Sequence, residues 1–211
     1  MGKIAAVAGA SGLVGSALLK KLLEEPSYEK VLSLVRKKSD FHHPKLLELV
    51  VDFDALPVDL AFTDFFCTLG TTIKKAGSEA AFSKVDFQYP LDLAKIAKSN
   101  GAKYFSVVTA MGSNVKSLFF YNRVKGQLEE SLKELNISSL CILRPSMLLG
   151  DRKEERFFES LAQKIMTFAA VILPPNVKAI EADKVAEAMI QNARNPKSGV
   201  SILNSGEIQK Y

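Results

Sequence analysis

The chain has 211 residues, of which 47% are hydrophobic and 24% are charged, with a formal net charge of +5. These values are ordinary for a globular protein, and the length suits one α/β domain over residues 1–211. We expect residues 151–211 to form a small C-terminal lobe on the substrate side of that domain. The basic residues are scattered in short runs, which argues against a nucleic-acid partner.

The apolar segments are short, which bears on the expected location. The first apolar run is too brief for a signal peptide, and residues 168–173 stop at two prolines, far short of a membrane span. Cys67 and Cys141 sit in apolar strand-like runs and are expected to be buried free thiols, typical of a reducing compartment. We therefore expect a cytoplasmic protein with no membrane partner.

A glycine-rich turn near the start carries the first functional signal. Residues 3–8 read as a buried strand, residues 16–23 have the leucine spacing of a helix, and the turn between them is Gly9-Ala10-Ser11-Gly12-Leu13-Val14-Gly15. Strand, glycine turn and helix in this order form the phosphate-binding corner of a dinucleotide fold. The alternative is a structural turn without a ligand. The expected cofactor contacts in this turn are Gly9, Ser11, Gly12, Leu13, Val14 and Gly15.

The second strand, residues 30–35, ends in basic residues. An NAD-binding protein usually has an acidic residue about 20 positions past the glycines, where it binds the adenine ribose hydroxyl. This chain has Arg36 and Lys37 instead, and cations there suit a 2′-phosphate. The sequence therefore favours NADP (NADPH) over NAD, with a solvated basic turn as the alternative.

Two further strands end in polar residues. Asp52 and Phe53 follow the third strand (46–51), and Leu69-Gly70-Thr71-Thr72 follow the fourth (63–68). Ligands bind at the carboxyl ends of such strands, so we expect these residues to border the cofactor. His42 and His43 lie in a loop without a ligand cluster around them, and we expect no metal site.

The remaining elements continue to alternate. A helix over 78–99, with Ser78 as its N-cap and a kink or break at Pro90, precedes a strand over 104–109. A helix over 117–135 and a strand over 138–143 follow, then helices over 154–170 and 182–190 and a last strand over 200–203. Alternating strands and helices predict an α/β fold with a doubly wound parallel sheet.

A second group of residues points to catalysis. Tyr121 and Lys125 are four positions apart and share one helix face. An ammonium beside a phenol stabilises the phenolate, so the tyrosine can exchange a proton with a carbonyl or an alcohol. Thr109, at the end of the preceding strand, has a hydroxyl suited to the substrate oxygen. The alternative is a surface tyrosine and lysine on an amphipathic helix, because the spacing itself is common.

Together these residues resemble the short-chain dehydrogenase/reductase superfamily, in its extended or atypical branch. The subgroup it is most similar to is that of the TIP30-like (HIV Tat-interacting) proteins and their bacterial relatives. The resemblance rests on the glycine turn, on Cys67-Thr68-Leu69-Gly70-Thr71-Thr72, on Val85-Asp86, on Tyr121-x-x-x-Lys125-Gly126 and on Arg144-Pro145. It covers most of the chain.

This resemblance implies a doubly wound Rossmann fold that binds NADPH, and a Ser/Thr–Tyr–Lys catalytic set that falls on Thr109, Tyr121 and Lys125. It also implies that Arg36 faces the 2′-phosphate and that Pro145 lies by the nicotinamide. Val108, at the end of the fifth strand, is a further expected cofactor contact. The chain departs from the superfamily in having Thr109-Ala110 before the tyrosine and no asparagine turn after the fourth strand.

The expected function is an NAD(P)H-dependent oxidoreductase that acts on a small carbonyl, alcohol or sugar-derived substrate by hydride transfer. The alternative is a non-catalytic NADPH-binding sensor. The expected partner is a small-molecule substrate, and the two long helices at 78–99 and 117–135 would allow a homodimer.

Overall fold

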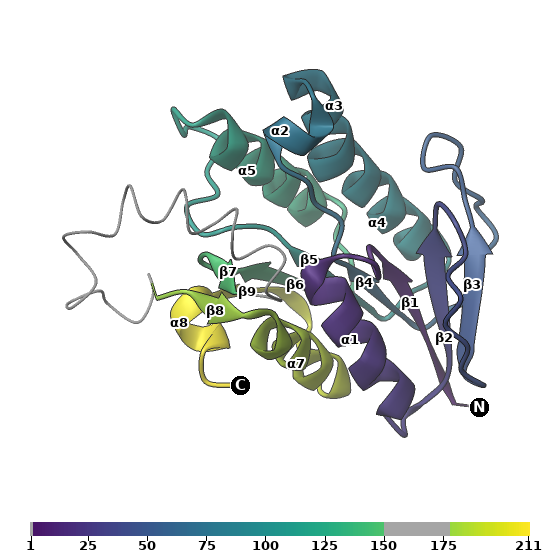
Figure 1. Cartoon of the computed structure of the whole chain (residues 1–211). Helices are drawn as coiled ribbons and strands as arrows, with labels where there is room; N and C mark the ends of the chain where they lie inside the picture. The colour runs from purple at the N-terminus through teal and green to yellow at the C-terminus, as the bar shows by residue number, and fades with distance from the viewer. Residues whose placement is uncertain (1, 150–177) are drawn as a thin grey trace.

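The computed structural model describes residues 2–149 and 178–211. Its main feature is a seven-stranded sheet in the order β3-β2-β1-β4-β5-β6-β9, and every pairing in it is parallel (Figure 1). The strand order reverses between β1 and β4, which opens a crevice at their carboxyl ends. The strands are β1 (Lys3–Ala8), β2 (Tyr28–Val35), β3 (Leu46–Val50), β4 (Asp64–Cys67), β5 (Tyr104–Val108), β6 (Ser139–Arg144) and β9 (Gly199–Asn204).

Helices cover both faces of this sheet, as the doubly wound prediction requires. Helices α1 (Leu13–Glu24) and α7 (Ala182–Arg194) cover one face, and α4 (Tyr89–Ser99) and α5 (Phe120–Glu134) cover the other (Figure 1). Side chains alternate between the two faces of a strand. In β1, Ala5 and Val7 accordingly join the core under α1 and α7, whereas Ala6 and Ala8 join the core under α4 and α5.

The helix expected over 78–99 is interrupted. It consists of α3 (Glu79–Ser83), one π-helical turn η1 (Lys84–Gln88), and α4, which has Pro90 in its first turn. The expected split at Pro90 does not occur, because the backbone stays helical from Glu79 to Ser99. The irregularity is the π-helical turn directly before Pro90, which has no N–H for the regular helix ladder. Ser78 is the N-cap, as expected: its hydroxyl accepts a hydrogen bond from the N–H of Ala81 at 3.1 Å. A short helix before it, α2 (Ile73–Ala76), is not apparent in the sequence pattern.

The end of the chain returns to the main sheet. Strand β9 pairs in parallel with β6, and α7 packs against α1. Strands β7 (Leu148–Leu149) and β8 (Ile180–Glu181) form a small parallel pair, and α8 (Ser205–Ile208) follows β9. The helix expected over 154–170 and the loop at Pro174-Pro175 lie outside the described residues. Cys67 and Cys141 are both buried and free, as expected.

Candidate functional site

The glycine turn joins β1 to α1 with almost no room to spare. Gly9 has φ +92°, and a Cβ there would lie 2.7 Å from the backbone carbonyl of Thr68. A Cβ on Gly15 would lie 2.0 Å from the oxygen of Gly9. Only glycine fits these two positions. Gly9 has a positive φ and contacts the residue after β4, and Gly15 lies where α1 packs directly on the turn.

The start of α1 is open toward the crevice. Ser11 and Gly12 are exposed, and Gly12 is the N-cap. No side chain in the described ranges caps the first turn of this helix. Free N–H groups at a helix N-terminus and its positive dipole end suit a phosphate, so the turn fits a dinucleotide pyrophosphate. Leu13 is half-buried and Val14 is buried, so these two contribute packing and backbone.

The neighbouring strands place the other expected cofactor residues at the same edge. Arg36 and Lys37 are exposed and directly follow β2, which pairs with β1. Asp52 is also exposed, and its Oδ1 accepts a hydrogen bond from the N–H of Asp54 at 2.9 Å. Phe53 is buried and packs on the ring of Tyr89, with 5.4 Å between ring centroids. Phe53 therefore offers little surface to a ligand.

Lys125 is the most constrained of the expected catalytic residues. It is buried, and its ammonium lies 2.8 Å from Oδ1 of Asp86, which is also buried. The other carboxylate oxygen of Asp86 accepts a hydrogen bond from the N–H of Thr71 at 2.9 Å. A side chain at Gly70 would come within 3.5 Å of Asp86 Oδ1 and 4.0 Å of Lys125 Nζ. Asp86 thus joins the turn after β4 to the lysine of α5.

The charge of Lys125 is maintained inside the protein. Burial lowers the pKa of Lys125, but the carboxylate of Asp86 and the nearby phenol of Tyr121 outweigh it, and the pKa lies above its usual value. The lysine is therefore cationic at neutral pH. The thiol of Cys67 lies in the same interior, and burial raises its pKa to about 12, so it stays protonated.

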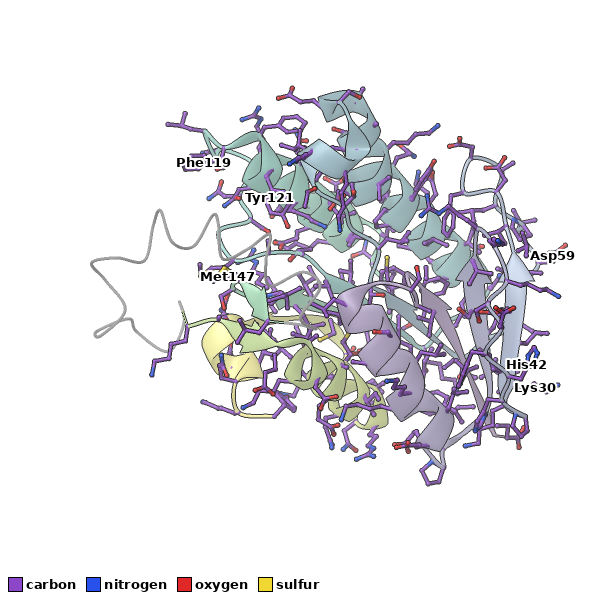
Figure 2. The ribbon with its side chains drawn as sticks, in the orientation of Figure 1. Lys30, His42, Asp59, Phe119, Tyr121 and Met147 are labelled. Atoms are coloured by element: carbon purple, nitrogen blue, oxygen red, sulfur yellow. The ribbon has the colours of Figure 1, made fainter. Side chains whose placement is uncertain are left out.

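Tyr121 lies one helical turn before Lys125, in the first turn of α5. It is half-buried, and its ring packs on Phe82 of α3 at a centroid distance of 5.5 Å. Figure 2 shows Tyr121 on the side of the molecule that also carries Met147, far from His42 and Lys30. The structure thus brings Tyr121, Lys125 and the turn Leu69–Thr72 together near the switch point of the sheet.

Thr109 is placed differently. Its hydroxyl is buried and donates to Oε1 of Glu129 at 2.7 Å. Glu129 is itself buried in α5 and forms a salt bridge with Arg144 at the end of β6. Arg144 Nε lies 3.0 Å from Oε1 and 3.1 Å from Oε2 of Glu129. A hydrogen bond from Thr109 to a substrate oxygen would require its one proton to leave Glu129. In this structure Thr109 supports α5.

Two buried carboxylates of the site were not singled out from the sequence. Asp86 was noticed only as part of a family resemblance, and Glu129 not at all. Each is an acid within an otherwise apolar helix face, which is costly to bury unless it is paired. That mismatch is the one signal in the sequence that points to them.

A hollow lies near the carboxyl end of β9. It has a volume of about 450 Å³ and is lined by Met111, Asn204, Ser205 and Glu207. Met111 follows β5, and the other three are at the end of β9 and in α8. The N–H of Met111 donates to the carbonyl of Pro145 at 2.8 Å, so the loops after β5 and β6 meet here. Val108 and Pro145, the other two expected cofactor contacts, are buried.

Fold and site together define an NAD(P)-binding Rossmann-type protein. Two family models match the chain: one described as HIM1 over residues 47–174, and an NAD-binding model described as Male sterility protein over residues 7–59. The first covers more than half of the chain, and the second covers the glycine turn and the strands after it.

Two relatives match the chain over most of their own length. Protein HTATIP2 of Rattus norvegicus is 36% identical over 203 residues, which are 92% of this chain and 82% of that protein. Protein FMP52, mitochondrial, of Candida albicans is 34% identical over 207 residues, 92% of this chain and 89% of its own length. The chain belongs to the HIM1 family and is related to HTATIP2 and FMP52.

These relatives correct the expected location. Several FMP52 relatives are named as mitochondrial proteins, which contradicts the cytoplasmic location expected from the sequence. The physical reason for the error is that short apolar runs and free thiols report on membrane insertion and redox state, and neither property separates one reducing compartment from another.

Solved structures show the same fold at low sequence identity. MoeE5 in complex with UDP-glucose and NAD has a TM-score of 0.73 at 15% identity, covering 95% of this chain and 75% of that chain. The ADP-L-glycero-D-manno-heptose-6-epimerase of Helicobacter pylori has a TM-score of 0.70 at 20% identity, covering 96% of this chain and 76% of that chain. At these identities the likeness establishes the fold alone.

Two other kinds of feature are absent from the part of the chain that the structure describes. None of the helices within residues 2–149 and 178–211 has the length and apolar character needed to cross a bilayer. In the same ranges, no three side chains of the metal-binding types gather closely enough to hold an ion.

Proposed function

We propose that the protein is an NADPH-dependent oxidoreductase that interconverts a small carbonyl compound and its alcohol. The observation that carries this proposal is the buried Lys125–Asp86 ion pair. It holds a cationic lysine one turn from Tyr121 and directly beside the turn after β4. Burying a charged pair is costly, and a purely structural role for it is served as well by apolar residues.

Each residue has a separate task in this proposal. The N–H groups at the start of α1 hold the pyrophosphate, and Lys125 orients the nicotinamide ribose. When bound, the reduced nicotinamide supplies a hydride to the carbonyl carbon. Tyr121 donates its phenolic proton to the carbonyl oxygen, and Lys125 stabilises the phenolate that remains. Thr109 takes part as a support of α5 through Glu129.

The preference for NADPH rests on Arg36 and Lys37. Both are exposed at the end of β2, next to the glycine turn on β1, and a 2′-phosphate there would meet two cations. A thermal-shift titration with NADPH, NADP, NADH and NAD tests this preference. Stabilisation by NADH alone would overturn it.

The substrate is proposed to be small. The hollow beside Met111 has a volume of about 450 Å³, which suits a compact carbonyl compound or a single sugar unit. Its lining residue Met111 and Tyr121 both come from the segment that follows β5, so we place the substrate between the hollow and the phenol.

The decisive test of the mechanism is Tyr121→Phe. Loss of the hydroxyl removes the proton donor but leaves the ring packed on Phe82, so we expect turnover of a carbonyl substrate to fall by about a hundredfold or more while NADPH binding is kept. Tyr211→Phe, which removes a hydroxyl near the C-terminus, is the matched control and should keep wild-type turnover. Full activity of Tyr121→Phe would refute the proposed role of Tyr121.

A second candidate is an NADPH-binding sensor without turnover, and the placement of Thr109 favours it. The hydroxyl of Thr109 donates to Glu129, so in this arrangement Tyr121 is the one expected catalytic hydroxyl that could donate to the substrate oxygen. Tight NADPH binding with no cofactor oxidation across a broad carbonyl panel would select the sensor.

A further inference from the structure

Two large apolar side chains project into solvent just before α5. Leu118 is 95% exposed and Phe119 is 74% exposed, the highest values for large hydrophobic residues among those described. We call this pair the apolar tip. Figure 2 shows Phe119 at the outer edge of the molecule, on the same side as Tyr121. The sequence pattern predicts a helix from residue 117, but α5 begins only at Phe120, so the tip is held in the loop.

The loop that carries the tip is braced. Arg123 Nη1 donates to the carbonyl oxygen of Ser117 at 2.9 Å, and the Ser117 hydroxyl accepts from the N–H of Phe119 at 3.2 Å. Asn114 accepts from Lys116 N at 2.7 Å through its side chain. Behind the loop, Phe120 packs on Phe82 at 5.8 Å and under the guanidinium of Arg123. The exposure of the tip is therefore built into the local structure, and exposing paired apolar residues calls for an explanation.

The charged residues nearest to the tip in the sequence are cations. Lys116 is exposed two positions before Leu118, and Arg123 at the start of α5 donates to the carbonyl of Ser117. From residue 93 to residue 128 the sequence contains no aspartate or glutamate, and the whole chain has a net charge of +5. A bilayer with anionic lipids has negatively charged headgroups at its surface and hydrocarbon beneath them. Apolar side chains next to cations complement such a surface.

We propose that the apolar tip is a membrane-docking element, with Leu118 and Phe119 inserting into the surface of a bilayer rich in anionic lipids. Lys116 meets the lipid headgroups. The tip is convex, so a protein partner would have to supply a matching pocket, whereas the acyl region of a bilayer accommodates a projecting side chain directly. This departs from the expectation of no membrane partner, and it is independent of the proposed oxidoreductase activity.

Docking by this tip would orient the site. Phe119 is two residues before Tyr121, and Asn122 in the same turn donates to the carbonyl of Gly112 at 2.9 Å, in the loop that follows Met111. A bilayer in contact with the tip would therefore lie next to the substrate side of the sheet edge. Figure 1 shows the loop before α5 projecting at the end of the molecule opposite β3.

The experiment is co-sedimentation of the full chain with lipid vesicles. Wild type is expected to bind vesicles of phosphatidylcholine and phosphatidylserine, and to bind pure phosphatidylcholine more weakly. Leu118→Ser with Phe119→Ser is expected to lower partitioning by about tenfold or more, since two large apolar side chains no longer leave water. Lys116→Glu should weaken binding to the anionic vesicles alone. Val58→Ser, at an apolar residue 63% exposed on another loop, is the matched control and should bind like wild type.

Three results would overturn the proposal. One is wild type that binds neither kind of vesicle. Another is a double variant that binds as well as wild type. The third is a wild-type dimer in sedimentation equilibrium, lost in the double variant and without vesicle binding, which would assign the tip to a second copy of the chain. Unchanged thermal unfolding of the double variant confirms that it folds, because neither side chain is buried.

Discussion

The three glycines of the first turn differ in how much space each has. A Cβ on Gly15 would lie 2.0 Å from the oxygen of Gly9, whereas a Cβ on Gly12 would lie 3.3 Å from the same atom. Gly15→Ala must push α1 away from β1, which we expect to cost about 1–3 kcal/mol of stability and to remove the NADPH-induced thermal shift. Gly12→Ala needs a movement of only a few tenths of an ångström and should keep most of that shift.

Thermal unfolding with and without NADPH measures both effects in one experiment. The comparison holds the residue type and the turn constant, so it isolates the close approach of helix and strand. Equal loss of the NADPH shift in the two variants would show that the turn is sensitive to any added carbon, and the role given to Gly15 would be wrong.

The carboxylate of Asp86 stabilises the protonated form of Lys125. Asp86→Asn retains an acceptor for the N–H of Thr71 but removes the negative charge beside a buried ammonium. The largest contribution that opposes burial is then gone, so the pKa of Lys125 falls and the lysine loses its proton at lower pH. We expect the alkaline limb of the pH–rate profile to move down by about one pH unit or more. Asp92→Asn, on the same run of helix, is the control.

The pH–rate profile separates this role from a structural one. A variant that is merely less stable loses activity at every pH in proportion to the unfolded fraction, whereas loss of the counter-ion moves one limb. An unchanged alkaline limb in Asp86→Asn would remove Asp86 from the mechanism.

How well single residues could be predicted from the sequence depends on how local their signal is. The glycine turn is found from the sequence because its geometry is set by adjacent residues. Tyr121 and Lys125 are found because helical spacing brings them to one face. Asp86 and Glu129 are missed, since their partners Lys125 and Arg144 come from other elements and only the folded chain brings them together.

Helix α5 is linked to the sheet by the ion pair between Glu129 and Arg144. Glu129 of α5 accepts from Arg144 of β6 and from the hydroxyl of Thr109. Glu129→Gln leaves a guanidinium without its counter-charge, which we expect to lower the free energy of unfolding by about 3 kcal/mol. Glu130→Gln, at an exposed neighbour paired with Lys133, should change it by less than about 1 kcal/mol.

Urea denaturation of the two variants is the measurement. Because Tyr121 and Lys125 lie on the same helix, NADPH binding should weaken in Glu129→Gln and stay normal in Glu130→Gln. Similar stability for the two would mean that the buried pair contributes no more than an exposed one.

The elements themselves were largely predictable, and their irregularities were predictable only in part. Pro90 predicts an irregularity in the helix over 78–99, because its missing N–H is a local property. No pattern in the sequence predicts the π-helical turn before Pro90, although this turn carries Asp86, the partner of Lys125. The start of α5 is also misplaced by the pattern, since Leu118 and Phe119 read as helical but are held in a loop by Arg123.

For the whole molecule, the alternation of strands and helices predicts a parallel sheet, but it does not fix where the last strand pairs. Strand β9 extends the sheet beside β6, which requires α7 to pack on α1. The end of α7 also reaches the first strand: Lys3 of β1 donates to the carbonyl of Ala193, 190 positions later, at 3.1 Å. The homodimer expected through α4 and α5 stays a prediction.

The contact between α1 and α7 also predicts how stability depends on pH in the acid range. Glu25, which follows α1, is buried and is paired with Arg194 at the end of α7. Burial raises the pKa of Glu25, but the hydrogen bonds from Arg194 and Ser27 outweigh it and hold the pKa below its ordinary value of 4.5. A carboxyl whose pKa is lowered on folding stabilises the protein fully above its unfolded pKa, and the contribution disappears as the pH falls through the folded pKa.

The free energy of unfolding should therefore fall between about pH 5 and pH 3, and Glu25→Gln should reduce that fall by about 1 kcal/mol, since Arg194 is partly exposed and solvent screens the pair. Glu24→Gln, at the exposed neighbouring position, should leave the fall unchanged. Denaturant titrations at pH 6 and pH 3 measure the difference. If wild type and Glu25→Gln lose the same free energy over this range, the pair does not hold α7 to α1, and the packing of the two helices alone closes the molecule.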